Sequence, residues 1–157
     1  MIKLLILGGI LFALVVLLLP MSRRGVRPAA WRMQSMNNLK QIGICLLEYE
    51  SKHGALPPAF TTNESGEKLH SWRTLILPFF EDGQRIYEKI DLTKPWDANE
   101  NAEAREESFD FYQRRDIGLA PGETTYCGIV GENYCLHPTQ GRAFAKIIDG
   151  IDQTIVV

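Results

Sequence analysis

The sequence has few of the residues and motifs on which enzymatic or metal chemistry depends. It contains three cysteines and three histidines among 157 residues, and the histidines form neither an HExxH nor a His-x-His arrangement. It has no Gly-x-Ser-x-Gly motif and no glycine-rich phosphate loop ending in Lys-Ser/Thr. A net charge of -2 is far from the strongly basic field typical of nucleic-acid-binding proteins. We therefore expect no catalysis, no cofactor or metal, and no nucleic-acid partner.

The long apolar run at the N-terminus predicts a membrane anchor. Residues 1–21 carry a single charge, Lys3, and residues 4–19 are apolar throughout, close to the length of about 20 residues that spans a bilayer. A cleaved signal peptide is the alternative, but Pro20 and two arginines follow where small residues would mark a cleavage site. We predict a single-pass anchor over residues 1–21 and one head domain over residues 22–157.

A second periodic segment predicts an amphipathic helix over residues 33–53. Its apolar residues recur every three or four positions, at Leu39, Ile42, Leu46 and Tyr49. Gly54 is a suitable C-terminal cap, and Pro57 and Pro58 prevent the helix from continuing. This helix is expected to lay one apolar stripe on the core of the head.

The rest of the chain predicts short elements and then a β region. Residues 61–69 are typical of a polar loop, residues 72–77 of a strand or a short helix, and residues 84–90 of a helix. From residue 124 to 157, β-rich runs alternate with turn signals such as Asp149-Gly150. The expected fold class is therefore α+β: a long N-terminal helix followed by a small antiparallel sheet formed by residues 124–157.

Six short motifs, in order along the chain, resemble those of the DUF1559 proteins. These are pilin-like proteins abundant in planctomycetes and related to the general-secretion pseudopilins. The matching residues are Asn37, Asn38, Leu39, Lys40, Gln41 and Gly43; Pro57 and Pro58; Trp72 and Pro78; Trp96 and Asp97; Gly131; and Asp149 and Gly150.

The resemblance implies a pilin-like architecture and no known reaction, and the missing motifs favour a non-catalytic role. The expected function is that of a membrane-anchored, pseudopilin-like structural or interaction protein of the cell envelope, assembling with copies of itself or with other pilin-like proteins. The resemblance also implies an extracytoplasmic head. Against this, Arg23, Arg24, Arg27 and Arg32 follow the apolar run, and the positive-inside rule alone would place the head in the cytoplasm.

A ligand-binding head for a glycan or a peptide is the alternative function. Its candidate residues are the aromatic side chains of Trp72, Trp96 and Tyr112: rings at the rim of a pocket would favour it, and rings buried in the core would exclude it. Separately, Cys127 and Cys135 flank a turn centred on Gly131. If they face each other across an antiparallel hairpin, the geometry permits a disulfide in an exported head, whereas a cytoplasmic head would keep both thiols reduced.

Overall fold

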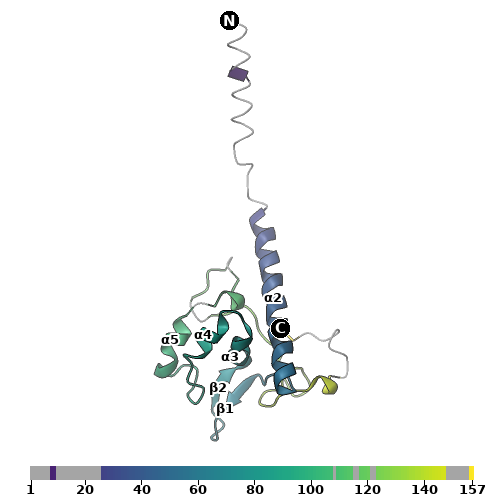
Figure 1. The fold of residues 1–157 in the computed structure, drawn as a ribbon, viewed down its shortest axis with the longest axis vertical. Helices are drawn as coiled ribbons and strands as arrows, with labels where there is room; N and C mark the ends of the chain where they lie inside the picture. The colour runs from purple at the N-terminus through teal and green to yellow at the C-terminus, as the bar shows by residue number, and fades with distance from the viewer. Residues whose placement is uncertain (1–7, 10–25, 108, 115–116, 121–122, 148–155) are drawn as a thin grey trace. The chain divides into compact units, whose positions relative to one another are not determined.

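The computed structural model describes residues 8–9, 26–107, 109–114, 117–120, 123–147 and 156–157 (Figure 1). The chain divides into two compact units, Met1–Met33 and Gln34–Val157, each considered by itself. Of the predicted anchor, only Gly8 and Gly9 belong to the described residues, and both are helical. Within the described ranges, no helix is long and apolar enough to span a membrane.

The predicted amphipathic helix is confirmed and is longer than expected. Helix α2 comprises Val26–His53. It ends at Gly54, whose φ of 75° is a left-handed conformation that favours glycine, and whose N–H donates to the Glu50 carbonyl at 2.7 Å. Lys52 and His53 lie in the last turn, where positive charge complements the helix dipole.

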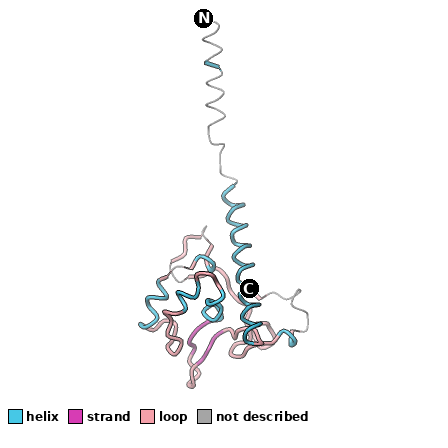
Figure 2. The backbone as a smooth tube through the Cα atoms, viewed as in Figure 1, coloured by secondary structure: helices cyan, strands magenta, loops and turns pink. Residues whose placement is uncertain are grey.

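Helix α2 supplies one wall of the hydrophobic core. Ile42, Cys45 and Leu46 are each at most 4% exposed. They belong to a cluster that includes the fully buried Ile76 and Leu136. The cluster therefore joins the helix to segments from the middle and the end of the chain. Figure 2 shows loops and short helices beside the lower part of this helix.

The sheet is small and lies in a segment interpreted above as a loop. Strand β1 (Phe60–Thr62) pairs antiparallel with β2 (Lys68–Ser71). The turn between them is stabilised by Asn63, whose side-chain oxygen accepts hydrogen bonds from the N–H groups of Ser65 and Glu67 at 3.0 and 2.9 Å. The polar residues that indicated a loop thus form the tip of a hairpin.

The antiparallel sheet predicted over residues 124–157 is wrong for the part of that region that the structure describes. Residues 123–147 and 156–157 contain no strand, only isolated bridges that join Leu56 to Arg142 and Val130 to Leu136. The backbone groups bond elsewhere: the carbonyl oxygens of His137 and Pro138 accept from residues 59 and 60. A β-rich run becomes a strand only if another strand lies beside it, and here its neighbour is the segment just after α2.

The remaining elements are short helices. They are α3 (Trp72–Ile76), η2 (Leu77–Phe79), α4 (Gly83–Tyr87), η3 (Asn99–Asn101), α5 (Ala102–Glu106), η4 (Asp110–Tyr112) and η5 (Phe144–Lys146). Helix α3 resolves the ambiguity at residues 72–77 in favour of a helix. Between η2 and α4 the chain approaches itself closely, because a Cβ atom at Gly83 would lie 2.0 Å from the Leu77 carbonyl oxygen. The described chain is therefore α+β, with a long N-terminal helix and a two-stranded antiparallel sheet.

Candidate functional site

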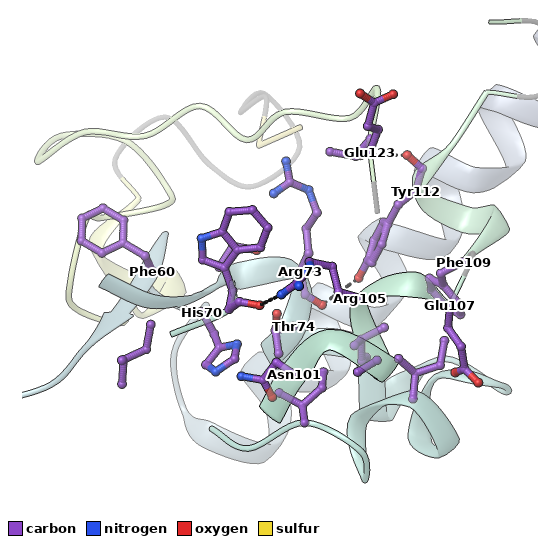
Figure 3. Close-up of a pocket in the computed structure, with 18 of the residues that line it drawn as sticks. Phe60, His70, Arg73, Thr74, Asn101, Arg105, Glu107, Phe109, Tyr112 and Glu123 are labelled. Atoms are coloured by element: carbon purple, nitrogen blue, oxygen red, sulfur yellow. Dashed lines mark hydrogen bonds between the residues drawn. The ribbon is translucent and has the colours of Figure 1, made fainter. Parts of the chain in front are cut away.

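The head contains a half-open cavity of about 450 Å³, which is called the head pocket here (Figure 3). It lies among β2, α3, α4, α5 and the segment from residue 109 to 124. Most of its surface is apolar. The apolar lining comprises Phe60, Leu69, Leu77, Ile86, Ile90, Trp96, Ala104, Phe109 and Tyr112. A volume of this size and a mainly apolar lining are typical of small-molecule sites.

Tyr112 forms a rigid part of the wall. Its ring packs edge-on against Phe80 and Phe109, with centroids 5.6 and 5.2 Å apart. Its hydroxyl donates to the Arg73 carbonyl oxygen at 2.8 Å. Burial raises the pKa of Tyr112 well above its usual value, so the phenol is neutral and keeps the proton that it donates.

The Arg73 side chain is positioned by Tyr126 and Trp72. Its Nε and Nη2 groups donate to the Tyr126 carbonyl oxygen at 3.3 and 3.1 Å. Its guanidinium carbon lies 5.2 Å from the centre of the Trp72 ring, within the range of a cation–π contact. Burial lowers the pKa of Arg73 from its usual value, and the proximity of Cys127 and Tyr112 acts in the opposite direction. An arginine remains charged at neutral pH in such a setting.

Asn101 fixes the loop that carries Trp96. The side chain of Asn101 is 2% exposed. Its oxygen accepts from the Asp91 N–H at 2.8 Å, and its nitrogen donates to the Asp91 and Pro95 carbonyl oxygens at 3.2 and 2.9 Å. The Trp96 main chain is held in turn by a 2.9 Å bond from its N–H to the Leu69 carbonyl. The indole of Trp96, 59% exposed, is thereby placed in the lining of the pocket.

A small charge network closes one side of the pocket. Glu107, which lines the pocket, receives Arg85 Nη1 at 2.6 Å and Lys89 Nζ at 3.0 Å on the same oxygen. Lys89 Nζ also lies 2.7 Å from Glu103. The hydrogen bonds from Lys89 and then Arg85 lower the pKa of Glu107, and the bond to Glu103 raises the pKa of Lys89. The Glu107 carboxylate is thus neutralised within the protein.

The structure places the three aromatic residues predicted for a ligand site in different surroundings. Trp72 is 3% exposed and belongs to the core, so it is excluded from the rim. Trp96 lines the head pocket with an exposed ring, and Tyr112 lines it from a buried position. The sequence analysis did not identify Arg73, Asn101 and Arg105, which also line the pocket. The only local signal was that Arg73 and Arg105 are cations next to apolar or small residues.

The predicted disulfide is not formed in the structure. Cys127 is an exposed free thiol and Cys135 a buried one. The expected antiparallel hairpin is absent because Val130 and Leu136 make a parallel bridge, which does not bring the two cysteines opposite each other. Cys45 is the third free thiol. Burial raises its pKa to about 12, and its Sγ donates to the Phe79 carbonyl at 3.4 Å.

The histidines make separate contacts. The His53 ring stacks on Tyr49 with centroids 4.2 Å apart, His70 Nε2 lies 3.2 Å from the Asp91 carbonyl oxygen, and His137 Nδ1 accepts two backbone N–H groups of its own turn. In the part of the chain that the structure describes, no three His, Cys, Asp or Glu residues could hold a metal ion together.

The outer side of α2 forms a second apolar surface, called the outer face here and consisting of Met36, Leu39, Gly43 and Leu47. Met36 is 69% exposed, Leu39 39% and Leu47 49%. Leu39, Gly43 and Leu47 also line a groove of about 500 Å³ whose other wall includes the C-terminal residues Val156 and Val157. Figure 1 shows the C-terminus beside α2.

The motif residues of the resemblance serve different parts of this structure. Asn38 is 6% exposed and its side-chain nitrogen donates to the Gln113 carbonyl at 3.2 Å, while Leu39 and Gly43 lie on the outer face. Pro57 and Trp72 are buried. Asp97 is exposed, and Asp149 and Gly150 lie outside the described residues.

The fold and the pocket define a small α+β head that follows a long helix, without a feature that assigns a reaction. A family model described as "Protein of unknown function (DUF1559)" matches residues 24–113, more than half of the chain. The chain therefore belongs to the DUF1559 family, as its motifs predicted. A search of curated proteins and a search of solved structures found no match.

Proposed function

We propose that this protein is a membrane-anchored, pilin-like and non-catalytic interaction protein of the cell envelope, and that it assembles with copies of itself through the outer face of α2. The observation that carries this proposal is that the apolar surface of α2 extends beyond the residues that it buries. Ile42, Cys45 and Leu46 are buried in the core, and the outer face beside them is exposed.

The spacing of the residues places the outer face beside the buried side of the helix. Met36, Leu39, Gly43 and Leu47 follow one another at intervals of three or four positions, so they line one side of a helix with 3.6 residues per turn. The buried Leu46, seven positions after Leu39, lies next to Leu39 on the helix surface. The apolar surface of α2 thus continues from buried onto exposed positions, and exposed apolar surface of this kind is typical of an interaction surface.

A second copy is the partner that fits this surface best. The outer face has a glycine at its centre, and a Cβ at Gly43 would meet no described atom within 4 Å, so there is open space directly over Gly43. The predicted anchors of residues 1–21 would pack laterally in the same assembly, and Gly8 and Gly9 would permit their close approach. Equivalent segments of neighbouring copies would then associate along their length.

The assembly is tested by placing a charge on the outer face of the full chain. Leu47→Glu should abolish chemical crosslinking between copies in membranes, because a carboxylate would be buried between apolar helices. Gln41→Glu, on an exposed position of α2 away from the outer face, is the matched control and should crosslink like the wild type. Crosslinking that survives Leu47→Glu would contradict assembly through this face.

The side of the membrane is tested separately. Glu67 is exposed at the tip of the hairpin, so Glu67→Cys, on a background without the native cysteines, presents one accessible thiol. Labelling by an impermeant thiol reagent in intact cells is expected for an extracytoplasmic head. Labelling only after lysis would mean that the arginine cluster sets the orientation, and the envelope role would then be refuted.

The head pocket favours a second function, the binding of a ligand by the same head. Trp96 and Tyr112 both line this pocket, as the ligand-binding alternative requires, although Trp72 does not. The alternative named a glycan or a peptide. Titration of the full chain with such ligands tests this function independently of crosslinking, because the outer face and the head pocket share no lining residue.

A further inference from the structure

We propose that the head pocket selects an apolar ligand that carries a carboxylate, with Arg73 as the main anion-binding residue. This inference rests on the second candidate function, ligand binding by the head, and specifies the chemistry that the pocket recognises. It is independent of assembly through α2.

The first argument is the charge of the lining. Three cations line the pocket: Lys68, Arg73 and Arg105. Among the described residues, none of them forms an ion pair. Lys68 lies over the Phe60 ring at 4.4 Å, and Arg105 donates to the Trp96 and Ala98 carbonyl oxygens.

The negative groups of the lining offset these cations only in part. Glu107 already binds two cations from outside the pocket through Oε1, and its buried Oε2 has no hydrogen-bond partner among the described residues. Glu123 is exposed, and its Oε2 accepts the Ala120 N–H at 2.9 Å. The three cations outnumber these two carboxylates, so the lining has an excess of positive charge, and the group that complements it is an anion.

The second argument is the state of Arg73 itself. Its guanidinium is partly buried, and both of its side-chain hydrogen bonds go to a single neutral acceptor, the Tyr126 carbonyl oxygen. Two donors that share one carbonyl leave further N–H groups of the planar fork open to solvent or to a ligand. A carboxylate matches the geometry of this fork, and partial burial strengthens its attraction to the cation.

The third argument is the remainder of the pocket, which is apolar and aromatic. Phe109 and Tyr112 lie on one side in Figure 3 and Phe60 on the other, with the exposed indole of Trp96 also in the lining. A neutral glycan needs many paired donors and acceptors, whereas most polar groups here are already bonded within the protein. An aromatic or aliphatic body next to a carboxylate satisfies both the apolar wall and Arg73.

A matched pair of probes tests this selectivity: N-acetyl-phenylalanine and its amide, which have the same ring and differ in the carboxylate. We expect calorimetric titration of the full chain at low salt to show the acid binding about ten-fold or more tightly than the amide, as for a charge-assisted hydrogen bond. Arg73→Gln should reduce this ratio to about one. Lys146→Gln, which removes an exposed cation outside the lining, should leave it unchanged.

Two further measurements keep the test decisive. The ratio in the wild type should fall as the salt concentration rises, and this needs no variant if Arg73→Gln fails to fold. Methyl 4-phenylbutanoate and 4-phenylbutanoate, a pair without a peptide group, distinguish a peptide-derived carboxylate from any apolar acid.

The outcomes distinguish the selectivity for a carboxylate from ligand binding by the head pocket itself. Equal binding of acid and amide would overturn the selectivity for an anion and leave ligand binding intact. No binding of any probe at millimolar concentration would overturn both. A selectivity that survives Arg73→Gln in a folded variant would overturn the role of Arg73.

Discussion

Removing the side chain of Asn101 should loosen the loop that presents Trp96 and destabilise the head. Asn101 makes three hydrogen bonds, to the Asp91 N–H and to the Asp91 and Pro95 carbonyl oxygens, while being 2% exposed. A typical hydrogen bond contributes about 0.5–1.5 kcal/mol, and buried groups left without a partner add to the loss, so Asn101→Ala should reduce the free energy of unfolding by about 2–4 kcal/mol.

The matched control lies in the same short helix. Asn99 is exposed and its side chain makes none of these bonds, so Asn99→Ala should change the free energy of unfolding by less than about 0.5 kcal/mol. Urea titration, with circular dichroism as the signal, gives both values. Similar reductions in the free energy of unfolding for the two alanine variants would refute the conclusion that the Asn101 side chain holds this loop.

A third variant distinguishes hydrogen bonding from packing. Asn101→Asp keeps the shape and the acceptor for the Asp91 N–H, but it places a carboxylate oxygen against two carbonyl oxygens. It should therefore be at least as destabilising as Asn101→Ala at pH 7. Burial beside two carbonyl oxygens would raise the pKa of the new carboxyl in the folded state, so the deficit relative to wild type should shrink as the pH falls through that pKa towards about 4, the pKa of an aspartate in the unfolded chain. A variant as stable as the wild type at pH 7 would contradict the hydrogen-bonding pattern.

Three further predictions concern single side chains. Gly83→Ala should destabilise the head by about 1–3 kcal/mol because the new Cβ overlaps the backbone, whereas Gly43→Ala, with open space around it, should stabilise α2 by about 0.5–1 kcal/mol in the same urea titration. Cys127 should react with a maleimide at pH 8 well before Cys45, whose pKa is raised to about 12; equal modification by mass spectrometry would contradict this. Because the pKa of Glu107 is lowered from 4.5, its contribution to stability should be complete above that value and lost as the pH falls through the folded pKa. In Glu107→Gln, the free energy of unfolding should therefore depend less on pH in this acidic range than in the wild type.

Sequence reasoning predicted α2 and its end because their signals are local. The spacing of Leu39, Ile42 and Leu46 is a property of one segment, and Gly54 followed by two prolines marks the end of a helix wherever that segment lies. The same holds for residues 84–90, where periodicity indicated the helix that the structure shows as α4.

The sheet could not be located in this way because strand pairing depends on distant residues. The run around residues 134–136 has β-forming side chains, but its neighbours in space are determined by how the core closes. Phe60–Thr62 and Lys68–Ser71 pair because a five-residue polar turn holds them together. The antiparallel hairpin on which the Cys127–Cys135 disulfide depended was misplaced for the same reason.

The head pocket was only partly predictable. Trp96 and Tyr112 were identified as aromatic candidates, but nothing in the sequence separated them from Trp72, which is buried. Arg73 and Asn101 carry no recognisable motif. Their importance follows from burial and from partners up to 53 positions away in the chain, which a single sequence does not reveal.

The way the core closes has a consequence for how the protein is made. The hydroxyl groups of Ser35 on α2 and Tyr126 lie 3.0 Å apart although they are 91 positions apart in the chain, and the segment after α2 bonds with residues 137–142. Such distant pairings form late, after most of the chain has been synthesised. Until then, the apolar side chains that α2 buries in the finished head are exposed, so we expect the nascent chain to be prone to aggregation.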